Sequence, residues 1–310
     1  MKEYSSILGL HAESEFCGVS RFNRILAEKL DVPSNNLDDS RIHEGKRVLI
    51  SIKFSELDLN HAKHEFGPEV INFQMFPDFD VFIHDHPSSP KHWDIISKAS
   101  HIYCGNSKIY KVVNERFSNS SPMWSPPTLP QFEDRITELE PVNFISFGMA
   151  HKIDINFHKQ LIDWLQSNNV DYRMTVSASP HEGEDFFSSS RRIKEGFEDL
   201  YGPNFIWAGY LGEQILLREL RQSDVFVGFY PDGVRENNSS AIAALTFGLK
   251  VITNFDIDSP DFFRKHESSI DIEELQRYSS LSLKKKSAGV TDRIGIYSWE
   301  NFLSALRGSV

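Results

Sequence analysis

The sequence has only two cysteines, Cys17 and Cys104, and no long apolar run. Two thiols this far apart give no metal-binding spacing, so we expect both to be plain thiols. No uninterrupted apolar stretch approaches the roughly 20 residues that a membrane helix needs. The N-terminus, MKEYSSILGLHAE, carries charges where a signal peptide has its apolar segment. We therefore expect no transmembrane segment and a cytoplasmic location.

Positive charge is scarce relative to negative charge. The 310 residues include 33 Lys and Arg against 44 Asp and Glu, which gives a formal net charge of -11. General nucleic-acid binders depend on an excess of Lys and Arg over the contact face, so we expect no such binding here. A hydrophobic content of 40%, with 12% aromatic residues, is enough for one large core or two ordinary ones.

Short apolar runs alternate with helical patterns along most of the chain. In the first part we expect strands near residues 5–13, 47–54, 80–85 and 101–106. Alternation of this kind indicates an α/β fold with mostly parallel sheets. The pattern stops between Ser118 and Glu140, a stretch rich in Pro and Ser, and resumes with VNFISFG. We therefore expect one α/β domain over residues 1–130 and a second over 131–295.

The stretch Ser223–Thr253 is the most informative part of the sequence. Its pattern predicts a buried strand, a polar loop, a helix of small residues and a second strand. In a parallel sheet this order places the loop at the carboxyl edge and points the helix N-terminus into a crevice. Helix N-termini bind phosphate through their amides and their dipole, so the stretch predicts a nucleotide-binding site.

Five segments, in the right order over most of the chain, resemble the retaining GT-B glycosyltransferases of the glycosyltransferase group 1 (family 4) type. The sequence CGVSRFNRILAEKL at Cys17–Leu30 is similar to the glycine loop and first helix of that family. Phe82–Val113 resembles the segment that opens with a strand ending in His-Asp. Phe144–Leu161 resembles the first strand and helix of the donor domain, and Phe205–Thr253 resembles the donor-site block. YSWENFLSAL at Tyr297–Leu306 resembles the closing helix.

The resemblance implies a GT-B fold: two Rossmann-like, doubly wound parallel-sheet domains facing a cleft, with residues 296–310 packing back toward the N-terminal domain. It implies a metal-independent transferase of carbohydrate biosynthesis that needs no cofactor. Such an enzyme moves a sugar, with retention, from a UDP- or GDP-linked donor to a hydroxyl of a carbohydrate, a lipid-linked molecule or another acceptor. Two other functions stay open, a nucleotide-sugar 2-epimerase and a non-catalytic sugar-nucleotide binding module.

The start of the predicted helix in Ser223–Thr253 supplies the first donor-binding candidates. Asn237, Asn238, Ser239 and Ser240 lead into this helix, and we expect their amides and hydroxyls to face the diphosphate. Simple N-capping by Asn or Ser is the alternative. The two uses are compatible, because a cap can also be the anion site.

Two further loops supply donor-binding candidates. His151 and Lys152 follow the strand that ends near Gly148, and Lys152 would be a point charge for the diphosphate. Gly148 marks the turn at the end of that strand. Gly18 would let the backbone of the first loop approach a phosphate, a use that requires the absence of a Cβ. The alternative for Gly18 is a plain turn glycine.

The donor block departs from the family pattern at its acidic positions. Members of the family usually carry a pair of glutamates at fixed spacing, and alignment on Gly248 places Arg235 and Ala243 at those positions. This puts the contact to the nucleotide ribose in doubt. Glu236 remains a candidate catalytic-site acceptor for sugar or ribose hydroxyls, with a solvated loop carboxylate as the alternative.

A polar group follows the expected strand near residues 80–85. In the resembling enzymes a histidine at the position of His84 lies beside the transferred sugar, where it can hydrogen-bond a hydroxyl or stabilise developing charge. We expect Asp85 to orient His84 or the acceptor. The alternative is a structural histidine. Asp78 and Asp80 form an Asp-x-Asp pattern, but they precede a core strand, so we expect them to mark a strand entry and not a metal site.

Overall fold

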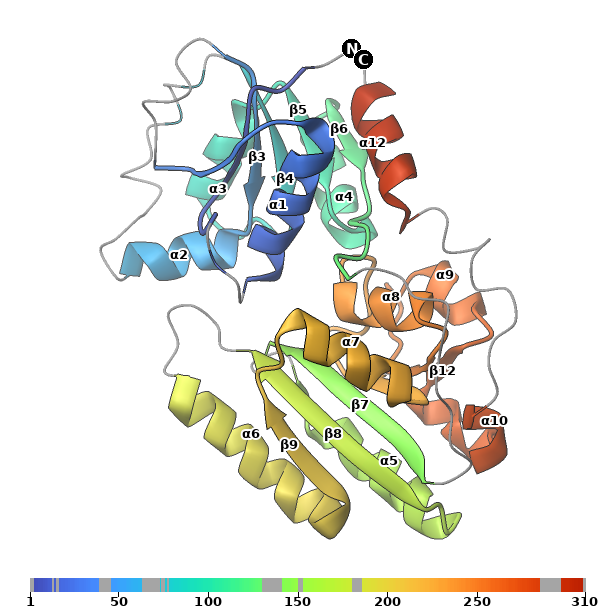
Figure 1. The fold of residues 1–310 in the computed structure, drawn as a ribbon. Helices are drawn as coiled ribbons and strands as arrows, with labels where there is room; N and C mark the ends of the chain where they lie inside the picture. Colours follow the sequence, from blue (N-terminus) through green and yellow to red (C-terminus); the bar gives the residue numbers. More distant parts are fainter. Residues whose placement is uncertain are drawn as a thin grey trace. The chain divides into compact units, whose positions relative to one another are not determined.

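The computed structural model describes residues 3–12, 14, 17–38, 46–62, 73, 76, 78–129, 141–149, 153–179, 186–284 and 297–308. The chain divides into two compact units (Figure 1). Unit 1 consists of Met1–Thr128 together with Ile296–Val310, and unit 2 consists of Leu129–Gly295. The chain therefore leaves unit 1 once and returns to it near its C-terminus. Among the described residues, no helix is long and apolar enough to cross a bilayer.

Unit 1 is built on a six-stranded sheet in which every neighbouring pair of strands is parallel. The strand order is β2-β1-β3-β4-β5-β6, so the chain adds one strand on one side of β1 and the remaining four on the other. The reversal falls between β1 and β3. The strands are β1 (Ile7–Gly9), β2 (Ser34–Asn36), β3 (Val48–Ile52), β4 (Phe79–Ile83), β5 (His101–Cys104) and β6 (Ser120–Pro122).

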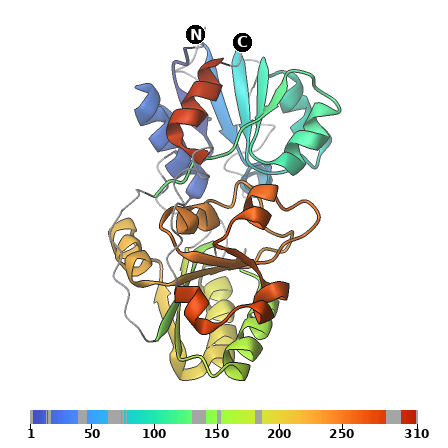
Figure 2. The same ribbon diagram turned by 90° about the vertical axis from the view of Figure 1, so that its right-hand side faces the viewer.

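Helices cover both faces of this sheet, and the alternation of side chains along the strands explains how. Val81 and Ile83 of β4 enter one apolar cluster, whereas Phe82 points to the opposite face and packs with α1 and α12. Figure 2 shows α12, in red, against the strands of unit 1 beside α1, in blue. The helices are α1 (Gly18–Leu30), α2 (Phe54–Ala62), α3 (Pro90–Ser97), α4 (Ser107–Asn114) and α12 (Trp299–Gly308).

The C-terminal helix belongs to unit 1 because its apolar side chains are buried there. Phe302 and Leu306 of α12 are 3% and 1% exposed and pack with Phe22 and Leu26 of α1. Burying two side chains of this size contributes about 1.5–3 kcal/mol each. The predicted return of the C-terminal helix to the first half of the fold is confirmed.

Unit 2 repeats the same design. Its six strands are all parallel, in the order β12-β11-β10-β7-β8-β9. The chain adds β8 and β9 on one side of β7 and then returns to add the last three strands on the other, so the reversal falls between β7 and β10. The strands are β7 (Val142–Met149), β8 (Tyr172–Ser179), β9 (Phe205–Gly209), β10 (Val225–Gly228), β11 (Lys250–Thr253) and β12 (Ser269–Asp271).

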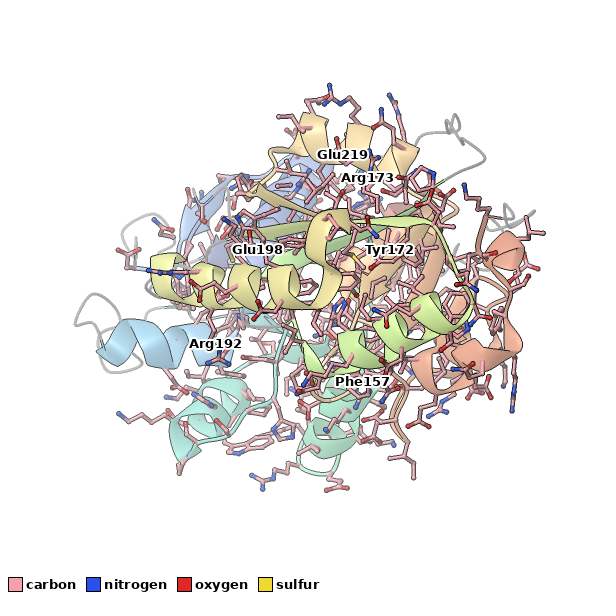
Figure 3. The ribbon with its side chains drawn as sticks, turned by 90° about the horizontal axis from the view of Figure 1, so that it is seen from below. Phe157, Tyr172, Arg173, Arg192, Glu198 and Glu219 are labelled. Atoms are coloured by element: carbon pink, nitrogen blue, oxygen red, sulfur yellow. The ribbon has the colours of Figure 1, made fainter. Side chains whose placement is uncertain are left out.

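The helices of unit 2 also lie on both faces of its sheet. Viewed from below in Figure 3, α5 and α6 lie on one side of the strands and α7 on the other, with Phe157 on α5 and Glu198 on α6. These two parallel sheets confirm the predicted α/β class with two Rossmann-like units. The helices are α5 (Asn156–Ser167), α6 (Phe186–Tyr201), α7 (Glu213–Gln222), α8 (Ser239–Thr246), α9 (Asp261–Lys265) and α10 (Ser280–Lys284).

Three strands were not anticipated from the sequence. β2 is made of Ser and Asn, and β6 consists of Ser-Ser-Pro inside the stretch expected to be connecting chain. β12 has only three residues. All three lie at sheet edges, where a short strand needs few apolar side chains and therefore gives no period-2 pattern.

A histidine is buried in the core of unit 2. His158 of α5 has no exposed surface and is enclosed by the rings of Phe197, Tyr201 and Phe229. Its Nδ1 lies 2.7 Å from the Tyr201 hydroxyl. Burial lowers the pKa of His158 from 6.5 to about 3, because the imidazolium form would lose its hydration.

This histidine makes the stability of the protein depend on pH. Below pH 6.5 the unfolded chain binds a proton at His158, whereas the folded chain does so only near pH 3. The contribution of the buried, neutral His158 to the free energy of unfolding is therefore complete above pH 6.5 and is lost as the pH falls toward 3. We expect the free energy of unfolding to fall by about 1.4 kcal/mol per pH unit in this window from His158 alone. In His158→Gln, denaturant unfolding at several pH values should show a correspondingly shallower slope. His86→Gln, which changes an exposed histidine, should leave the slope as it is, and an unchanged slope in His158→Gln would contradict this assignment.

Candidate functional site

The strand order of unit 2 identifies one edge of its sheet as the place for a ligand. In open parallel sheets, ligands bind outside the carboxyl ends of the two strands between which the strand order reverses. Here those strands are β7, which ends at Gly148 and Met149, and β10, which ends at Gly228. Gly148 has a φ of 150°, and a Cβ built on it would meet no atom of the described residues within 4 Å. Among these residues, the glycine leaves space at the end of β7.

The helix that follows β10 begins at this same edge. α8 starts at Ser239, as predicted, with Asn238 at its N-cap. The Asn238 side chain does not cap α8, because its Oδ1 accepts the backbone amide of Arg235 at 2.5 Å. In the part of the chain that the structure describes, the amides of Ser240 and Ala241 have no hydrogen-bond acceptor. Simple N-capping by Asn238 therefore does not account for this helix start, which keeps two donors for an anion.

Tyr230 connects the end of β10 to the first turn of α8. Its hydroxyl lies 3.1 Å from Ser240 Oγ, and burial raises the pKa of Tyr230 to about 12, so the phenol stays protonated. The backbone of Tyr230 is held on the other side by the Asn254 side chain. Asn254 accepts the Tyr230 amide at 2.8 Å and donates to its carbonyl at 2.7 Å. The Ser240 side chain is thus positioned by a buried residue whose backbone is fixed just beyond the end of β10.

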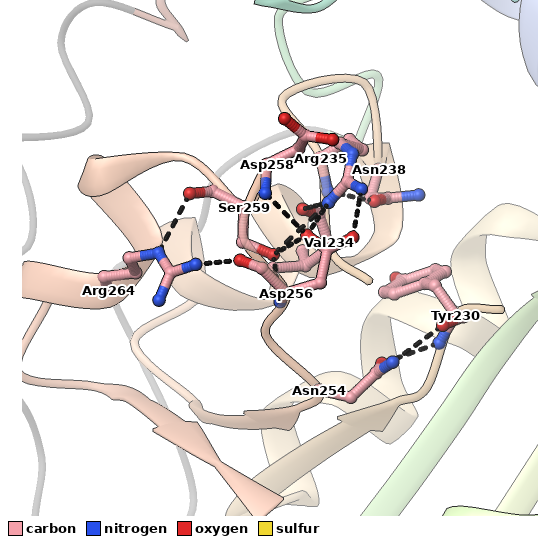
Figure 4. A network of polar contacts seen from close by, with 9 residues as sticks. All are labelled: Tyr230, Val234, Arg235, Asn238, Asn254, Asp256, Asp258, Ser259 and Arg264. Atoms are coloured by element: carbon pink, nitrogen blue, oxygen red, sulfur yellow. Dashed lines mark hydrogen bonds and ion pairs between the residues drawn. The ribbon is translucent and has the colours of Figure 1, made fainter. Parts of the chain in front are cut away.

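The loop between β10 and α8 is fastened by an ion pair (Figure 4). The guanidinium of Arg235 donates to both carboxylate oxygens of Asp256, at 2.7 and 2.5 Å. It also donates to the Val234 carbonyl at 2.9 Å and approaches Ser259 Oγ at 3.3 Å. Arg235 is 6% exposed. A bidentate pair of this kind fixes the orientation of both side chains as well as their separation.

Asp256 is in turn part of a compact loop. Its carboxylate accepts the amide of Asp258 at 3.1 Å and the hydroxyl of Ser259 at 3.0 Å. Burial acts to raise the pKa of Asp256, but the hydrogen bonds from Arg235 and Ser259 and the charge of Arg235 outweigh it, and the pKa is lowered. Arg264 donates to the backbone carbonyls of Ser259 and Asp256 from outside. The loop after β11 therefore braces the loop after β10.

The structure shows what Arg235 and Ala243 do at the two positions where the resembling family carries glutamates. Its guanidinium is bonded to Asp256, and Ala243 is 2% exposed inside α8. Neither residue presents a carboxylate at this edge. Glu236 is buried at 3% exposure between Arg235 and the half-buried Asn237. The two candidates that follow β7, His151 and Lys152, lie outside the described residues.

The corresponding edge of unit 1 lies at the carboxyl ends of β1 and β3, where the strand order of that sheet reverses. Gly18, the first residue of α1, has open space around the position of a Cβ. By contrast, a Cβ on Gly9 at the end of β1 would lie 2.5 Å from Asn23 Nδ2. Gly9 is therefore the glycine that lets the end of β1 approach Asn23 of α1 closely. Gly18 instead leaves room beside the start of α1.

A buried charged pair follows β3 at this edge. Lys53 Nζ lies 2.7 Å from Glu56 Oε1, and the two residues are 8% and 4% exposed. The Cys17 thiol lies 3.8 Å from Glu56 Oε2. Burial, followed by the negative charge of Glu56, raises the pKa of Cys17, so this cysteine is a protonated and unreactive thiol.

His84 follows β4 on the same face as Phe82, because side chains two residues apart point the same way along a strand. Its Nε2 lies 2.8 Å from Ser51 Oγ on the neighbouring strand β3. Its ring contacts Phe82 at 4.7 Å and meets Phe22 of α1 edge-on at 5.4 Å. His84 is half-buried. The structure thus holds this imidazole in one orientation at the carboxyl edge of the sheet.

Asp85 has a different environment from the one expected. Its two carboxylate oxygens accept the backbone amides of Phe54 and Ser55, at 2.6 and 2.8 Å. These are the first residues of α2, so Asp85 satisfies the amides at the start of that helix. Ser51, and not Asp85, bonds Nε2 of His84.

The Asp-x-Asp pair lies at the opposite end of β4. Asp80 has no exposed surface and accepts from Arg47 at 2.8 Å and from the Tyr4 hydroxyl. Asp78 lies 3.4 Å from the same guanidinium. Both carboxylates pair with a cation at the amino end of the sheet, as expected for a strand entry.

Several residues that shape these two edges were missed from the sequence. Tyr230 was expected only as the last residue of a strand, and Asn254 and Asp256 were not singled out. Lys53 and Ser51 follow or belong to a strand with no local motif around them. The one signal available was their position after an apolar run, which marks the carboxyl edge where ligands bind. These residues are Ser51, Lys53, Glu56, Tyr230, Asn254 and Asp256.

Removing the Arg235 guanidinium should destabilise unit 2 measurably. Arg235→Ala leaves the Asp256 carboxylate and the Val234 carbonyl without this donor, and we expect a loss of about 2–3 kcal/mol in the free energy of unfolding. The figure is below that for a fully buried pair because Asp256 is 37% exposed. Arg264→Ala, which removes an exposed arginine from the same network, should cost under about 1 kcal/mol. Equal losses in the two variants, measured by urea unfolding, would show that Arg235 is not the central brace.

Comparison with known proteins gives similarity at the level of structure alone. No protein-family model matches the sequence, and no curated protein sequence matches it. The lipopolysaccharide outer core galactosyltransferase WaaB in its apo form superposes with a TM-score of 0.60 at 12% identity, over 98% of each chain. A glycosyltransferase from Rickettsia africae gives 0.60 at 11% identity, over 99% of this chain and 97% of its own. HepE of Anabaena in complex with UDP and glucose gives 0.61 at 9% identity, over 98% of this chain and 100% of its own. Two parallel-sheet units, together with similarity to these glycosyltransferases over almost the whole chain, show that this chain has the GT-B fold.

Proposed function

We propose that this protein is a retaining glycosyltransferase, which moves a sugar from a nucleoside diphosphate sugar to an acceptor hydroxyl without a metal ion. In the reaction the bond between the anomeric carbon and the diphosphate oxygen breaks, the acceptor oxygen bonds to the same face of that carbon, and the acceptor hydroxyl gives its proton to the leaving diphosphate oxygen. The nucleoside diphosphate is released. Catalysis then depends on orientation of the reactants and on stabilising the charge of the leaving diphosphate.

The start of α8 is the observation that carries this proposal. It lies where the strand order of unit 2 reverses, its Ser240 and Ala241 amides have no acceptor among the described residues, and Tyr230 positions its Ser240 hydroxyl. Two amides and a hydroxyl at a helix N-terminus suit a diphosphate. The three glycosyltransferases of the same fold support this choice of ligand. HepE was solved with UDP and glucose, so a UDP-linked sugar is the first donor to test, with GDP-linked sugars next.

Other residues of unit 2 take supporting roles in the proposal. Asn238, Ser239 and Ser240 bind the diphosphate, and Lys152, with His151 beside it, adds a positive charge. Gly148 lets the donor approach the end of β7, where its backbone leaves open space. Glu236 and Asn237 accept and donate hydrogen bonds to the hydroxyls of the ribose or the sugar.

In unit 1 the proposal gives His84 the contact with the transferred sugar. An imidazole held by Ser51, Phe82 and Phe22 is preorganised to hydrogen-bond a hydroxyl or to stabilise charge at the anomeric carbon. Asp85 supports this edge by capping α2. Gly18, with open space around it, leaves room for a phosphate or an acceptor at the start of α1.

A non-catalytic sugar-nucleotide binding module is the second candidate. The observation in its favour is that the two positions where the resembling family carries glutamates hold Arg235, bonded to Asp256, and the buried Ala243. Such a module would bind the donor through the same start of α8. The two functions are separated by turnover: tight donor binding with no transfer and no donor hydrolysis would favour the module.

Loss of the Lys152 charge should weaken donor binding. In calorimetric titrations with UDP, we expect Lys152→Ala to raise Kd about 10- to 100-fold, the size of one charge-assisted hydrogen bond. Lys159→Ala removes a lysine that is exposed on α5 and should leave Kd unchanged. Equal affinities for Lys152→Ala and the unmodified protein would remove Lys152 from the donor site.

Loss of the His84 imidazole should slow turnover while leaving the fold and the donor site intact. With a panel of nucleotide sugars, we expect His84→Ala to lower kcat about 10²- to 10⁴-fold, whether the reaction measured is sugar transfer or the slower hydrolysis of the donor. Its Kd for UDP should stay within about twofold, because His84 is assigned to the sugar and not to the nucleotide. His86→Ala, at an exposed neighbouring position, is the matched control. Unchanged turnover in His84→Ala would end the role proposed for this residue.

A further inference from the structure

Two aromatic side chains, Trp299 and Phe22, connect the C-terminal helix to His84 within unit 1. Trp299, the first residue of α12, stacks on Phe22 of α1 with ring centroids 5.5 Å apart and planes inclined by 23°. Phe22 in turn meets the His84 imidazole edge-on, at 5.4 Å and 81°. The contacts are therefore sequential: Trp299 lies against one ring, and that ring lies against the histidine.

Trp299 is held from two further directions. Its indole Nε1 donates to the backbone carbonyl of Pro127 at 3.1 Å. The Lys29 ammonium lies over its ring at 5.6 Å, within the range of a cation–π contact. Pro127 precedes the point where the chain leaves unit 1, and Trp299 follows the point where it returns. The indole is thus fixed by α1 and by the segment that leads out of the unit.

The attachment of α12 does not depend on this tryptophan alone. Phe302 and Leu306 are almost fully buried in unit 1, whereas Trp299 is only half-buried. Phe302 also touches Phe22, at 5.5 Å, and Phe82, at 5.8 Å. Burial of Phe302 and Leu306 is enough to hold α12 on unit 1. The contacts of Trp299 with Phe22, Pro127 and Lys29 therefore have a role other than attaching the helix.

We propose that Trp299 is a positioning residue for His84. It fixes the plane of Phe22, and Phe22 fixes the plane of the imidazole against Ser51 and Phe82. Edge-to-face contacts depend on the mutual orientation of the rings, so a Phe22 ring released on its Trp299 side would no longer define one imidazole orientation. The effect of Trp299 on turnover rests on the proposed function of His84, but its effect on the orientation of the ring does not.

The experiment compares three variants of the full chain: Trp299→Ala, Trp299→Phe and Leu306→Ala. Leu306 is the matched control, because it is buried in the same helix and the same apolar cluster but has no aromatic ring to stack on Phe22. Each variant is measured for its thermal midpoint, for the imidazole resonances of His84 by NMR, and for kcat and KM with the donor that the unmodified protein uses. The His84 resonances are assigned by their loss in His84→Ala.

We expect Trp299→Ala to shift the His84 resonances and to lower kcat about 10- to 100-fold, with KM for the donor within about twofold. Trp299→Phe keeps a stacked ring, so its His84 resonances and its kcat should lie close to those of the unmodified protein. Leu306→Ala should lower the thermal midpoint at least as much as Trp299→Ala, yet leave the His84 resonances and kcat unchanged at a temperature where it is folded.

Two results would overturn the proposal. One is a set of His84 resonances that Trp299→Ala does not move. The other is a shift of the same size in Leu306→Ala, which would make Trp299 one more core residue of the helix. If the unmodified protein shows no transfer with any donor, the proposed function fails, and the NMR comparison alone still decides whether Trp299 orients His84.

Discussion

The reversal of strand order in each parallel sheet is the constraint on which the rest of this structure depends. A parallel sheet must be covered on both faces, and its chain can cover the second face only by returning to the middle and adding strands on the other side. In unit 1 the return falls between β1 and β3, and in unit 2 between β7 and β10. At these points the loops diverge to opposite faces and leave the carboxyl edge open. The start of α8 lies at this edge in unit 2, and His84 follows β4, the neighbour of β3, at the carboxyl edge of unit 1.

Unit 2 shows how such an edge is made rigid enough to bind a ligand. Two amides at the start of α8 have no acceptor among the residues that the structure describes, and the position of this helix start is set by Tyr230, Asn254 and the Arg235–Asp256 pair. Each of these hydrogen bonds contributes only about 1 kcal/mol of net stability. Together they define where the amides point, and a preorganised donor loses less entropy when it binds an anion. The same logic applies to His84, which Ser51, Phe82 and Phe22 hold in unit 1.

The sequence predicted the fold class, the main strands and the start of α8, because these depend on local patterns of apolar and polar residues. It also placed His84 directly after a buried strand. It could not predict that Asp85 caps α2 or that Asp256 pairs with Arg235, because each contact joins segments that are distant in the chain. The contact of Trp299 with Phe22 brings together the two ends of the sequence. Edge strands such as β6 were not predicted because two serines and a proline show no alternation of apolar and polar residues.

The central claim of this account is that the diphosphate of a nucleotide sugar binds at the start of α8. A crystal structure of the protein with UDP tests it most directly. The account predicts diphosphate oxygens about 2.7–3.2 Å from the amides of Ser240 and Ala241 and near the Ser240 hydroxyl. UDP bound elsewhere in the protein, with no contact to those two amides, would contradict it.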